Sequence, residues 1–195
     1  MLQNNINSYQ EITLLPSQEI NLNFLMSKIF GSLHRLFVKN QMNGVINNGI
    51  SFPEYDLENK TLGSKIRVFF DSVEACEKMN LKEYLKVFDD YIHITKRRNI
   101  PSNVEYAVFR RVQLKGNKYK LARRYSKRNN VSYNDALELY SKYEQKTCSL
   151  PYIKLNSSSN GNPYIIFIEK VDSTNHGNSF NTFGLSSNSG VPIFK

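Results

Sequence analysis

The stretch NLNFLMSKIFGSLHRLFVKN, residues 21–40, decides the fold of the first half of the chain. Its apolar residues recur every three or four positions, which is typical of the buried face of a long amphipathic helix. These residues are Leu22, Leu25, Met26, Ile29, Leu33, Leu36 and Phe37. Gly44 and the Asn-rich segment around it end the pattern. We therefore expect a long helix over residues 21–40.

Segments with the period of β-strands lie on both sides of this helix. They are YQEITLL (9–15), GISFP (49–53), KIRVFFD (65–71) and DYIHITK (90–96). A second helical stretch spans about 72–88, and Asp71 and Glu74 have the spacing of a capping pair. The order β-α-β-β-α-β predicts an α+β fold with an N-terminal ferredoxin-like domain at residues 1–99.

The pattern of strand and helix segments in residues 100–195 predicts a second α+β domain. Its expected elements are a strand at 104–114, a basic helix at 118–128, a helix from about Ser132, and strands at 150–156 and 163–171. The last two strands flank SSSNGN, in which Asn160-Gly161 is a β-hairpin turn signal. The helix after Ser132 has one apolar face, formed by Ala136, Leu137, Tyr140 and Tyr143. The tail at 172–190 is rich in Ser, Asn and Gly, and we expect loops there.

The positive charge is concentrated in one segment. The net charge is +9, and nine basic residues without any Asp or Glu lie between Tyr106 and Asn134, so the rest of the chain is neutral. The nine are Arg110, Arg111, Lys115, Lys118, Lys120, Arg123, Arg124, Lys127 and Arg128. A solvated helix face usually mixes acids with bases, so a purely cationic segment favours a site for a polyanion such as nucleic acid.

Five of these cations share one face of the predicted basic helix. They are Lys120, Arg123, Arg124, Lys127 and Arg128, at positions i, i+3, i+4, i+7 and i+8. Arginine can grip a phosphate or the edge of a guanine with two hydrogen bonds. The major groove of continuous A-form RNA is too narrow for side chains, but the groove of a short stem-loop opens at its ends. The helix indicates nucleic acid without distinguishing RNA from DNA.

Several classes of protein and site are disfavoured. Cys76 and Cys148 lack zinc-ligand spacing, and no P-loop, GxSxG or HExxH motif is present, so we expect neither a metal site nor a cofactor. The N-terminus lacks the apolar region of a signal peptide, and no apolar run is long enough to span a membrane. We therefore expect a bacterial cytoplasmic location without membrane association.

Three histidines and one serine cluster are candidates for acid–base or nucleophilic chemistry. His34 lies on the long helix among core residues, so a structural role and a catalytic role both stay open. His93 alternates with isoleucines and predicts a structural role, and His176 lies in an uninformative polar loop. Ser157, Ser158 and Ser159 fit either an active site or a plain hairpin turn.

Blocks along most of the chain resemble the precursor-RNA processing endoribonucleases of type I-F CRISPR systems. The blocks are LMSKIFGSLHRLF (25–37), GISFPEYD (49–56), FRRVQLKGN (109–117), LPYIKLNSSSNGN (150–162), FNTFGLS (180–186) and the terminal VPIF. The resemblance implies a second domain that presents the arginine-rich helix to a repeat hairpin. It also implies metal-independent attack of a 2′-hydroxyl at the 3′ base of that hairpin, leaving a 2′,3′-cyclic phosphate and a 5′-hydroxyl.

The resemblance also assigns residues. The family's catalytic histidine falls on His34, its active-site serine on Ser157, and the tyrosine beside its histidine on Phe183. Its base-reading positions fall on Arg111, Gln113 and Arg124. Its phosphate-contacting helix positions fall on Arg123, Lys127 and Arg128, and Lys120 lies on the same face. An imidazole near neutral pH can act as base or as acid, and the sequence does not choose between them.

Two departures from the family pattern bear on function. Phe183 lacks the tyrosine hydroxyl, and Lys127 keeps a charge but not the planar fork of arginine. The implied partners are the CRISPR repeat stem-loop RNA and other subunits of a type I-F surveillance complex. The alternatives are a subunit that binds the crRNA hairpin without cutting it and an unrelated regulatory RNA-binding protein.

Overall fold

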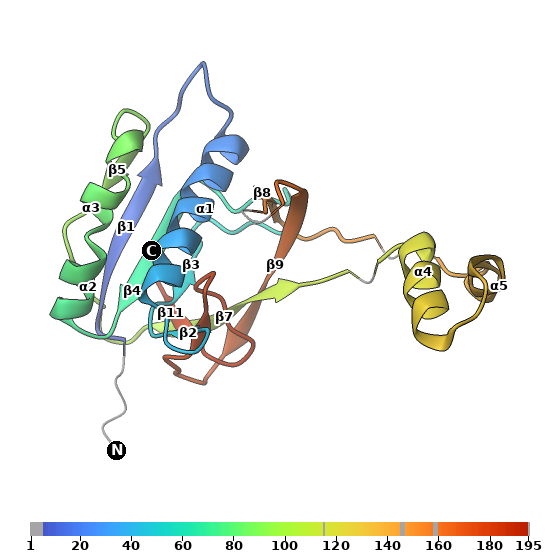
Figure 1. Cartoon of the computed structure of the whole chain (residues 1–195). Coiled ribbons are helices and arrows are strands. Elements are labelled where there is room, and N and C mark those ends of the chain that lie inside the picture. The colour runs from blue at the N-terminus through green and yellow to red at the C-terminus, as the bar shows by residue number, and fades with distance from the viewer. Residues whose placement is uncertain (1–5, 115, 145–146, 158–159, 195) are drawn as a thin grey trace. The chain divides into compact units, whose positions relative to one another are not determined.

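The computed structural model describes residues 6–114, 116–144, 147–157 and 160–194. The predicted candidates Lys115, Ser158 and Ser159 lie outside the described residues. The chain forms two compact units (Figure 1). The first comprises Met1–Val112 and Leu150–Lys195, and the second comprises Gln113–Ser149. These units have other boundaries than the two domains expected at 1–99 and 100–195, and that division stays a prediction.

The first sheet of the first unit has the order β3-β4-β1-β5, with antiparallel neighbours. Its strands are β1 (Ser8–Leu14), β3 (Ile50–Ser51), β4 (Lys65–Phe70) and β5 (Ile92–Ile94). All four lie within or next to the predicted strand segments. The short strand β6 (Arg98–Asn99) also pairs with β1.

The long helix α1 (Leu22–Asn40) confirms the prediction made from its periodicity. It begins at Asn21, whose side chain accepts a hydrogen bond from the N–H of Asn23, and such a cap satisfies one of the free N–H groups of the first turn. Six of the seven residues of the predicted apolar face are buried, and Ile29, Leu33 and Phe37 are fully inaccessible to solvent. Leu22 is exposed, because it lies at the first position of the helix. The helix contacts β1 and also β8 (Tyr152–Asn156) of the second sheet.

The segment predicted as one helix at 72–88 is divided into three short pieces. They are α2 (Val73–Met79), α3 (Leu81–Tyr84) and the 3-10 helix η1 (Lys86–Phe88). Asn80 adopts a left-handed conformation with φ 39°, so it ends α2 and caps α3. The predicted cap at Asp71 is also wrong, because the side chain of Ser72 accepts the hydrogen bond from Ala75 N–H.

The second sheet has the order β11-β7-β9-β8 and is antiparallel throughout. Its strands are β7 (Glu105–Val112), β8 (Tyr152–Asn156), β9 (Pro163–Ser173) and β11 (Val191–Ile193). The hairpin of β8 and β9 confirms the turn predicted from Asn160-Gly161. The expectation of loops throughout 172–190 is wrong in part, because β10 (Phe180–Asn181) pairs with β2 (Val45–Ile46) there.

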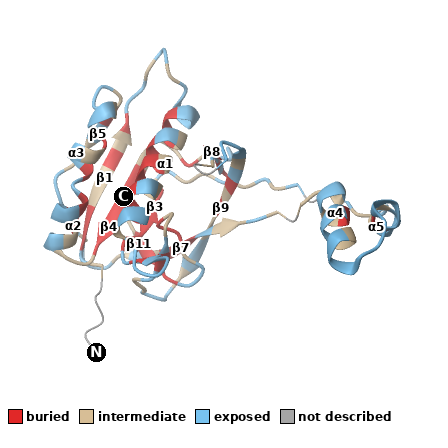
Figure 2. Cartoon of the chain, viewed as in Figure 1, coloured by how far each residue is buried: buried red, intermediate tan, exposed pale blue. Residues whose placement is uncertain are grey.

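One continuous core joins the two sheets of the first unit (Figure 2). Leu33 and Phe37 of α1 belong to the same buried cluster as Phe109 of β7 and Ile166 of β9. A sheet with one apolar face needs such a partner layer, and here the second sheet supplies part of it. The histidine-bearing helix is therefore held between elements from both halves of the sequence.

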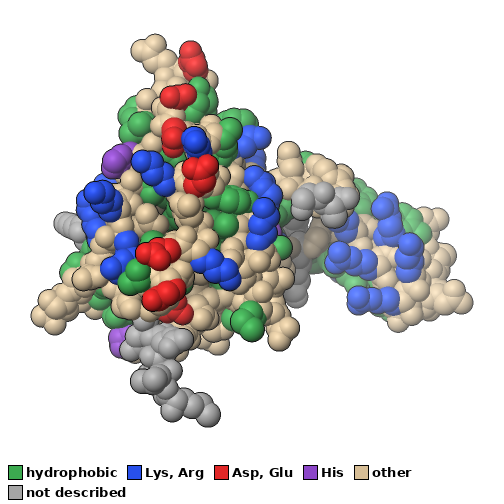
Figure 3. All heavy atoms as spheres, turned by 60° about the vertical axis from the view of Figure 1, so that its left-hand side comes forward, with side chains coloured by type: hydrophobic (Ala, Val, Ile, Leu, Met, Phe, Trp, Pro, Cys, Tyr) green, Lys and Arg blue, Asp and Glu red, His purple; other side chains and the backbone are tan. Residues whose placement is uncertain are grey.

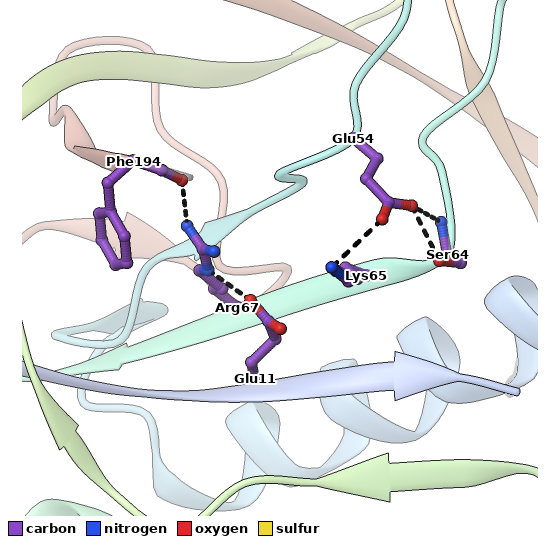
Figure 4. Close-up of polar contacts among 6 residues, drawn as sticks. All are labelled: Glu11, Glu54, Ser64, Lys65, Arg67 and Phe194. Carbon is purple, nitrogen blue, oxygen red and sulfur yellow. Dashed lines mark hydrogen bonds and ion pairs between the residues drawn. The ribbon is translucent and has the colours of Figure 1, made fainter.

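Polar contacts tie the C-terminal segment to the first sheet (Figure 4). The buried guanidinium of Arg67 donates to Glu11 Oε2 at 2.7 Å and to the carbonyl oxygen of Phe194 at 2.6 Å. It also lies over the Phe194 ring, 4.1 Å from the centroid. A buried arginine is stable only when it is paired and hydrogen-bonded, so these contacts fix the end of the chain.

Among its described residues, the second unit contains two helices, α4 (Lys118–Asn129) and α5 (Tyr133–Leu139). Both helices were predicted, but α5 ends at Leu139, so Tyr140 and Tyr143 of its predicted apolar face lie beyond the helix. Ala122 of α4 and Ala136 of α5 are fully buried. The Tyr125 ring packs edge-on against Tyr140, 6.2 Å between centroids. Over the residues that the structure describes, neither unit contains a helix that could cross a bilayer.

Candidate functional site

His34 is held by a backbone carbonyl from the far end of the chain. It lies half-buried on α1, and its Nδ1 is 2.7 Å from the carbonyl oxygen of Thr182. A carbonyl can only accept a hydrogen bond, so Nδ1 carries the proton. In the neutral imidazole, Nε2 then has a free lone pair and is the ring nitrogen that can accept a proton.

The ring of Phe183 covers one face of the imidazole. The two rings are nearly parallel, with an interplanar angle of 10° and 3.9 Å between centroids. Phe30, one turn before His34 on α1, is also parallel to Phe183, with 5.9 Å between centroids. Phe183 therefore fixes the plane of the imidazole while the Thr182 carbonyl fixes its tautomer.

The loop that carries Thr182 and Phe183 is itself fixed. Asn181 Oδ1 accepts hydrogen bonds from the N–H of Phe183 at 2.8 Å and of Leu185 at 3.4 Å. Gly184 has φ 71°, and its carbonyl accepts the N–H of Ile50 at 2.9 Å. A Cβ at Gly184 would lie 2.7 Å from the Ile50 side chain, so only glycine fits.

Arg111 joins this group from β7. Its guanidinium carbon lies 5.6 Å from the centroid of the Phe183 ring, within the range of a cation–π interaction. His34 and Arg111 therefore both contact the ring of Phe183, and the structure brings these three residues, all predicted from the sequence, together.

Ser157 lies at the turn of the β8–β9 hairpin. Its N–H donates to the Asn162 carbonyl at 2.9 Å, and its own carbonyl accepts the N–H of Gly161 at 2.8 Å. Its neighbour Asn156 lines a cavity of about 650 Å³ that His34 also lines. The hairpin therefore places Ser157 next to the cavity that His34 lines.

The cavity lies between the first turns of α1 and the β8–β9 hairpin. Three cations, Lys28, Arg35 and Lys154, line it, and no Asp or Glu lies among the described residues of its lining. These cations were not among the residues predicted from the sequence. The signal that was available is the spacing of Lys28 and Arg35 on the polar face of α1 and the alternation that exposes Lys154 on β8.

The predicted cationic face is present on α4 in the second unit. The cap of α4 is Asn117, whose side chain accepts the N–H of Lys120. All five predicted side chains are exposed, and none forms an ion pair with another described residue: Lys120, Arg123, Arg124, Lys127 and Arg128. Lys and Arg side chains gather on the face of this unit seen in Figure 3, with no acidic side chain among them.

The remaining candidates contribute less. Gln113 is exposed and begins the second unit, directly after β7. Arg110 is not a free cation, because its Nε donates to Glu169 Oε2 at 2.8 Å. His93 is exposed on β5, and exposed His176 lies edge-on against Tyr106. Among the described residues, no group of three or more His, Cys, Asp or Glu side chains is arranged to hold a metal ion.

These features define an α+β protein in which a cationic helix and an oriented histidine belong to separate compact units. The sequence model of the CRISPR-associated protein (Cas_Csy4) family matches residues 9–194, and the chain belongs to that family.

Two curated relatives match the chain along nearly its whole length. One is the CRISPR-associated endonuclease Cas6/Csy4 of Pseudomonas aeruginosa (strain UCBPP-PA14), 28% identical over 188 residues. The other is the protein of the same name from Escherichia coli (strain UTI89 / UPEC), 27% identical over 188 residues. Each comparison covers 95% of this chain and 98% of the relative.

Proposed function

We propose that this protein is an endoribonuclease that processes CRISPR precursor RNA at the 3′ base of a repeat hairpin and stays bound to the hairpin. Family membership and the names of the two relatives support the class of activity. The observation that carries the proposal is the orientation of His34, whose Nδ1–H is bound to Thr182 and whose ring is stacked on Phe183.

In the proposed reaction, His34 acts as the general base. Its Nε2 accepts the proton of a ribose 2′-hydroxyl, and the 2′-oxygen attacks the adjacent phosphorus. The bond between phosphorus and the 5′-oxygen breaks, and that oxygen takes a proton from solvent. The products are a 2′,3′-cyclic phosphate and a 5′-hydroxyl. Much of the acceleration comes from holding the 2′-oxygen in line with the leaving group, for which Ser157 is the candidate.

This mechanism makes the nucleophile by proton transfer to an imidazole, so it does not require a metal ion or cofactor. Incubating the protein with a repeat RNA in excess EDTA and identifying the product ends tests the proposal. Cyclic phosphate and 5′-hydroxyl ends are expected. A 3′-hydroxyl with a 5′-phosphate, or cleavage only after a divalent cation is restored, would contradict it.

Recognition of the hairpin is assigned to the cationic face of α4 and to Arg111. We expect Arg124, Arg111 and Gln113 to read bases, and Lys120, Arg123, Lys127 and Arg128 to contact phosphates. The lack of acidic neighbours on the α4 face supports phosphate contacts, because these cations have no competing protein anion among the described residues. The same hairpin would link the protein to the other subunits of a type I-F surveillance complex.

We also infer that the N-terminal part is a ferredoxin-like domain. The sheet order β3-β4-β1-β5 with antiparallel neighbours supports it, since the four strands and the intervening helices α1 and α2 follow the split β-α-β-β-α-β pattern.

A second candidate function is a subunit that binds the hairpin without cutting it. Phe183 favours it, because phenylalanine cannot donate or accept a hydrogen bond where the family has a tyrosine hydroxyl. The EDTA experiment separates the two functions, because a pure binder leaves the RNA intact.

A further inference from the structure

Among the described residues, the charged side chains that line the cavity beside His34 are all basic. We call it the α1–β8 cleft, and its lining includes Phe24, Lys28, Arg35, Tyr152 and Lys154. Lys28, Arg35 and Lys154 are exposed and form no ion pair within the described part of the chain. Arg35 is oriented by a 2.8 Å hydrogen bond from its Nη2 to Ser32 Oγ, another lining residue. Cations without protein anions favour a polyanionic ligand.

The cleft also exposes aromatic rings. Of the Phe and Tyr residues that the structure describes in the first unit, only Phe24 and Tyr152 are exposed, at 55% and 45%, and both line the cleft. The ammonium of Lys28 lies 4.9 Å from the Phe24 ring centroid, and that of Lys154 lies 5.8 Å from the Tyr152 centroid. Exposed rings interleaved with cations are the pattern that binds single-stranded nucleic acid, by base stacking and phosphate contacts.

The size of the cleft restricts the ligand. Its volume of about 650 Å³ is that of a small-ligand pocket, which has room for a short single strand and not for a duplex. In the proposed reaction, the nucleotide before the scissile phosphate is the last of a base-paired stem. The strand that begins after the scissile phosphate is single-stranded, and it starts beside His34.

We propose that the α1–β8 cleft binds the single-stranded RNA on the 3′ side of the cleavage site. This inference rests on the proposed function and names a part of the substrate that the helix α4 does not account for. Bases of this flank stack on Phe24 and Tyr152, and its phosphates contact Lys28, Arg35 and Lys154. The flank is then anchored on the side of the leaving 5′-oxygen, which helps to hold the reacting atoms in line.

The test measures binding of hairpins that cannot be cut because the attacking nucleotide is 2′-deoxy. One hairpin ends at the scissile phosphate, a second continues for about four nucleotides on the 3′ side, and a third carries the same extension on the 5′ side. The 3′ extension should tighten binding to the unaltered protein about tenfold. The 5′ extension should have little effect.

The variant Lys28→Ala/Lys154→Ala should lose most of the gain from the 3′ extension while it binds the unextended hairpin normally. The matched control is Lys39→Ala/Lys82→Ala, which removes two exposed lysines outside the cleft lining and should keep the gain. Tyr152→Ala should also lose part of the gain, and this loss should persist at high salt because stacking is not screened.

Three results would overturn the inference: a gain that survives in the cleft variant, an equal loss in the control variant, or a gain that comes from the 5′ extension. Cleavage of an ordinary ribose hairpin by the unaltered protein is measured in parallel. If that hairpin is cut but the 3′ extension gives no gain, only the cleft assignment fails. If it is neither bound nor cut, the proposed function fails.

Discussion

The imidazole of His34 and the ring of Phe183 lie face to face, with 3.9 Å between their centroids and 10° between their planes. The Phe183 ring is also 5.6 Å from the guanidinium carbon of Arg111 and parallel to Phe30. A side chain with so many ring contacts positions its neighbours by its shape and its π-face. This arrangement indicates that the aromatic ring of residue 183 organises the site. The hydroxyl group that a tyrosine would add at this position matters less.

The first prediction follows from that arrangement. Phe183→Ala should slow single-turnover cleavage clearly, because the loss of packing lets the imidazole leave its in-line position. Phe183→Tyr keeps the ring and should change the rate by less than about tenfold, or about 1.4 kcal/mol. Both rates are measured at saturating protein. A hundredfold gain with tyrosine would mean that the hydroxyl matters and would favour the hairpin-binding subunit.

The second prediction concerns His34. His34→Ala should lower the single-turnover rate by about 10²- to 10⁴-fold, the usual contribution of a general acid or base, with little change in hairpin affinity. His93→Ala is the matched control, because His93 is exposed on β5. This variant should cleave the RNA normally. Normal cleavage by the His34 variant, or a loss of affinity in proportion to rate, would show that this assignment is wrong.

The elements predicted well from the sequence are those with strong local periodicity. The apolar stripe of residues 21–40 is long enough to be unambiguous, and Asn160-Gly161 between two apolar runs is a strong hairpin signal. The break at Asn80 was missed because the left-handed conformation of an asparagine leaves no mark on the hydrophobic pattern. The pairing of β2 with β10 was missed because two-residue strands have no measurable period.

Less of the site than of the fold could be predicted from the sequence. Periodicity alone left His34 open between a core role and a catalytic one, and only the family resemblance placed Phe183 beside it. The Thr182 contact is made by a backbone carbonyl, which any residue type supplies, so no sequence signal exists for it. The cleft cations were missed because Lys28 and Lys154 are distant in sequence and meet only when β8 packs beside α1.

The third prediction concerns product release. The cations of α4 and Arg111 are proposed to bind the hairpin, which cleavage leaves intact, so the product should dissociate slowly. Excess RNA should give about one cut per protein and then a plateau. Arg128→Ala weakens one proposed phosphate contact and should raise the turnover that follows the first cut. Sustained rapid turnover by the unaltered protein would contradict retention of the hairpin.

The fourth prediction concerns acid stability and Glu54. Partial burial acts to raise the pKa of this carboxylate, but hydrogen bonds from the Ser64 N–H and hydroxyl and the ammonium of Lys65 outweigh burial and lower the pKa below its ordinary value of 4.5. A carboxylate with a lowered pKa stabilises the fold at neutral pH, and this stabilisation is lost as the pH falls through the folded-state pKa.

Glu54→Gln should therefore lower the free energy of unfolding at neutral pH by about 0.5 kcal/mol or less, because the Lys65 pair is solvent-screened. The difference from the unaltered protein should shrink below about pH 4.5. Denaturant unfolding at several pH values measures it, and Glu58→Gln, an exposed glutamate of the same loop region, is the control. A difference that grows as the pH falls would contradict the sign of the shift.

The last prediction concerns which side chains of α4 read bases and which contact phosphates. Arg124 and Lys120 are both exposed on this helix, and neither pairs with an acid among the described residues, so removing either leaves no buried charge. A guanidinium can hold a guanine edge through two hydrogen bonds, whereas an ammonium acts on a phosphate as a point charge. Arg124→Ala should therefore weaken binding of the correct hairpin by about 1–3 kcal/mol and blunt discrimination at one base pair. Lys120→Ala should weaken all hairpins alike and reduce the slope of log affinity against log salt by about one unit.

Titrations of matched and base-substituted hairpins over a salt series measure both effects. Arg124→Lys separates charge from shape, because it keeps the salt slope and should still lose discrimination. Equal losses at both positions, regardless of sequence, would show that the helix binds only the phosphate backbone and that base reading depends on other residues.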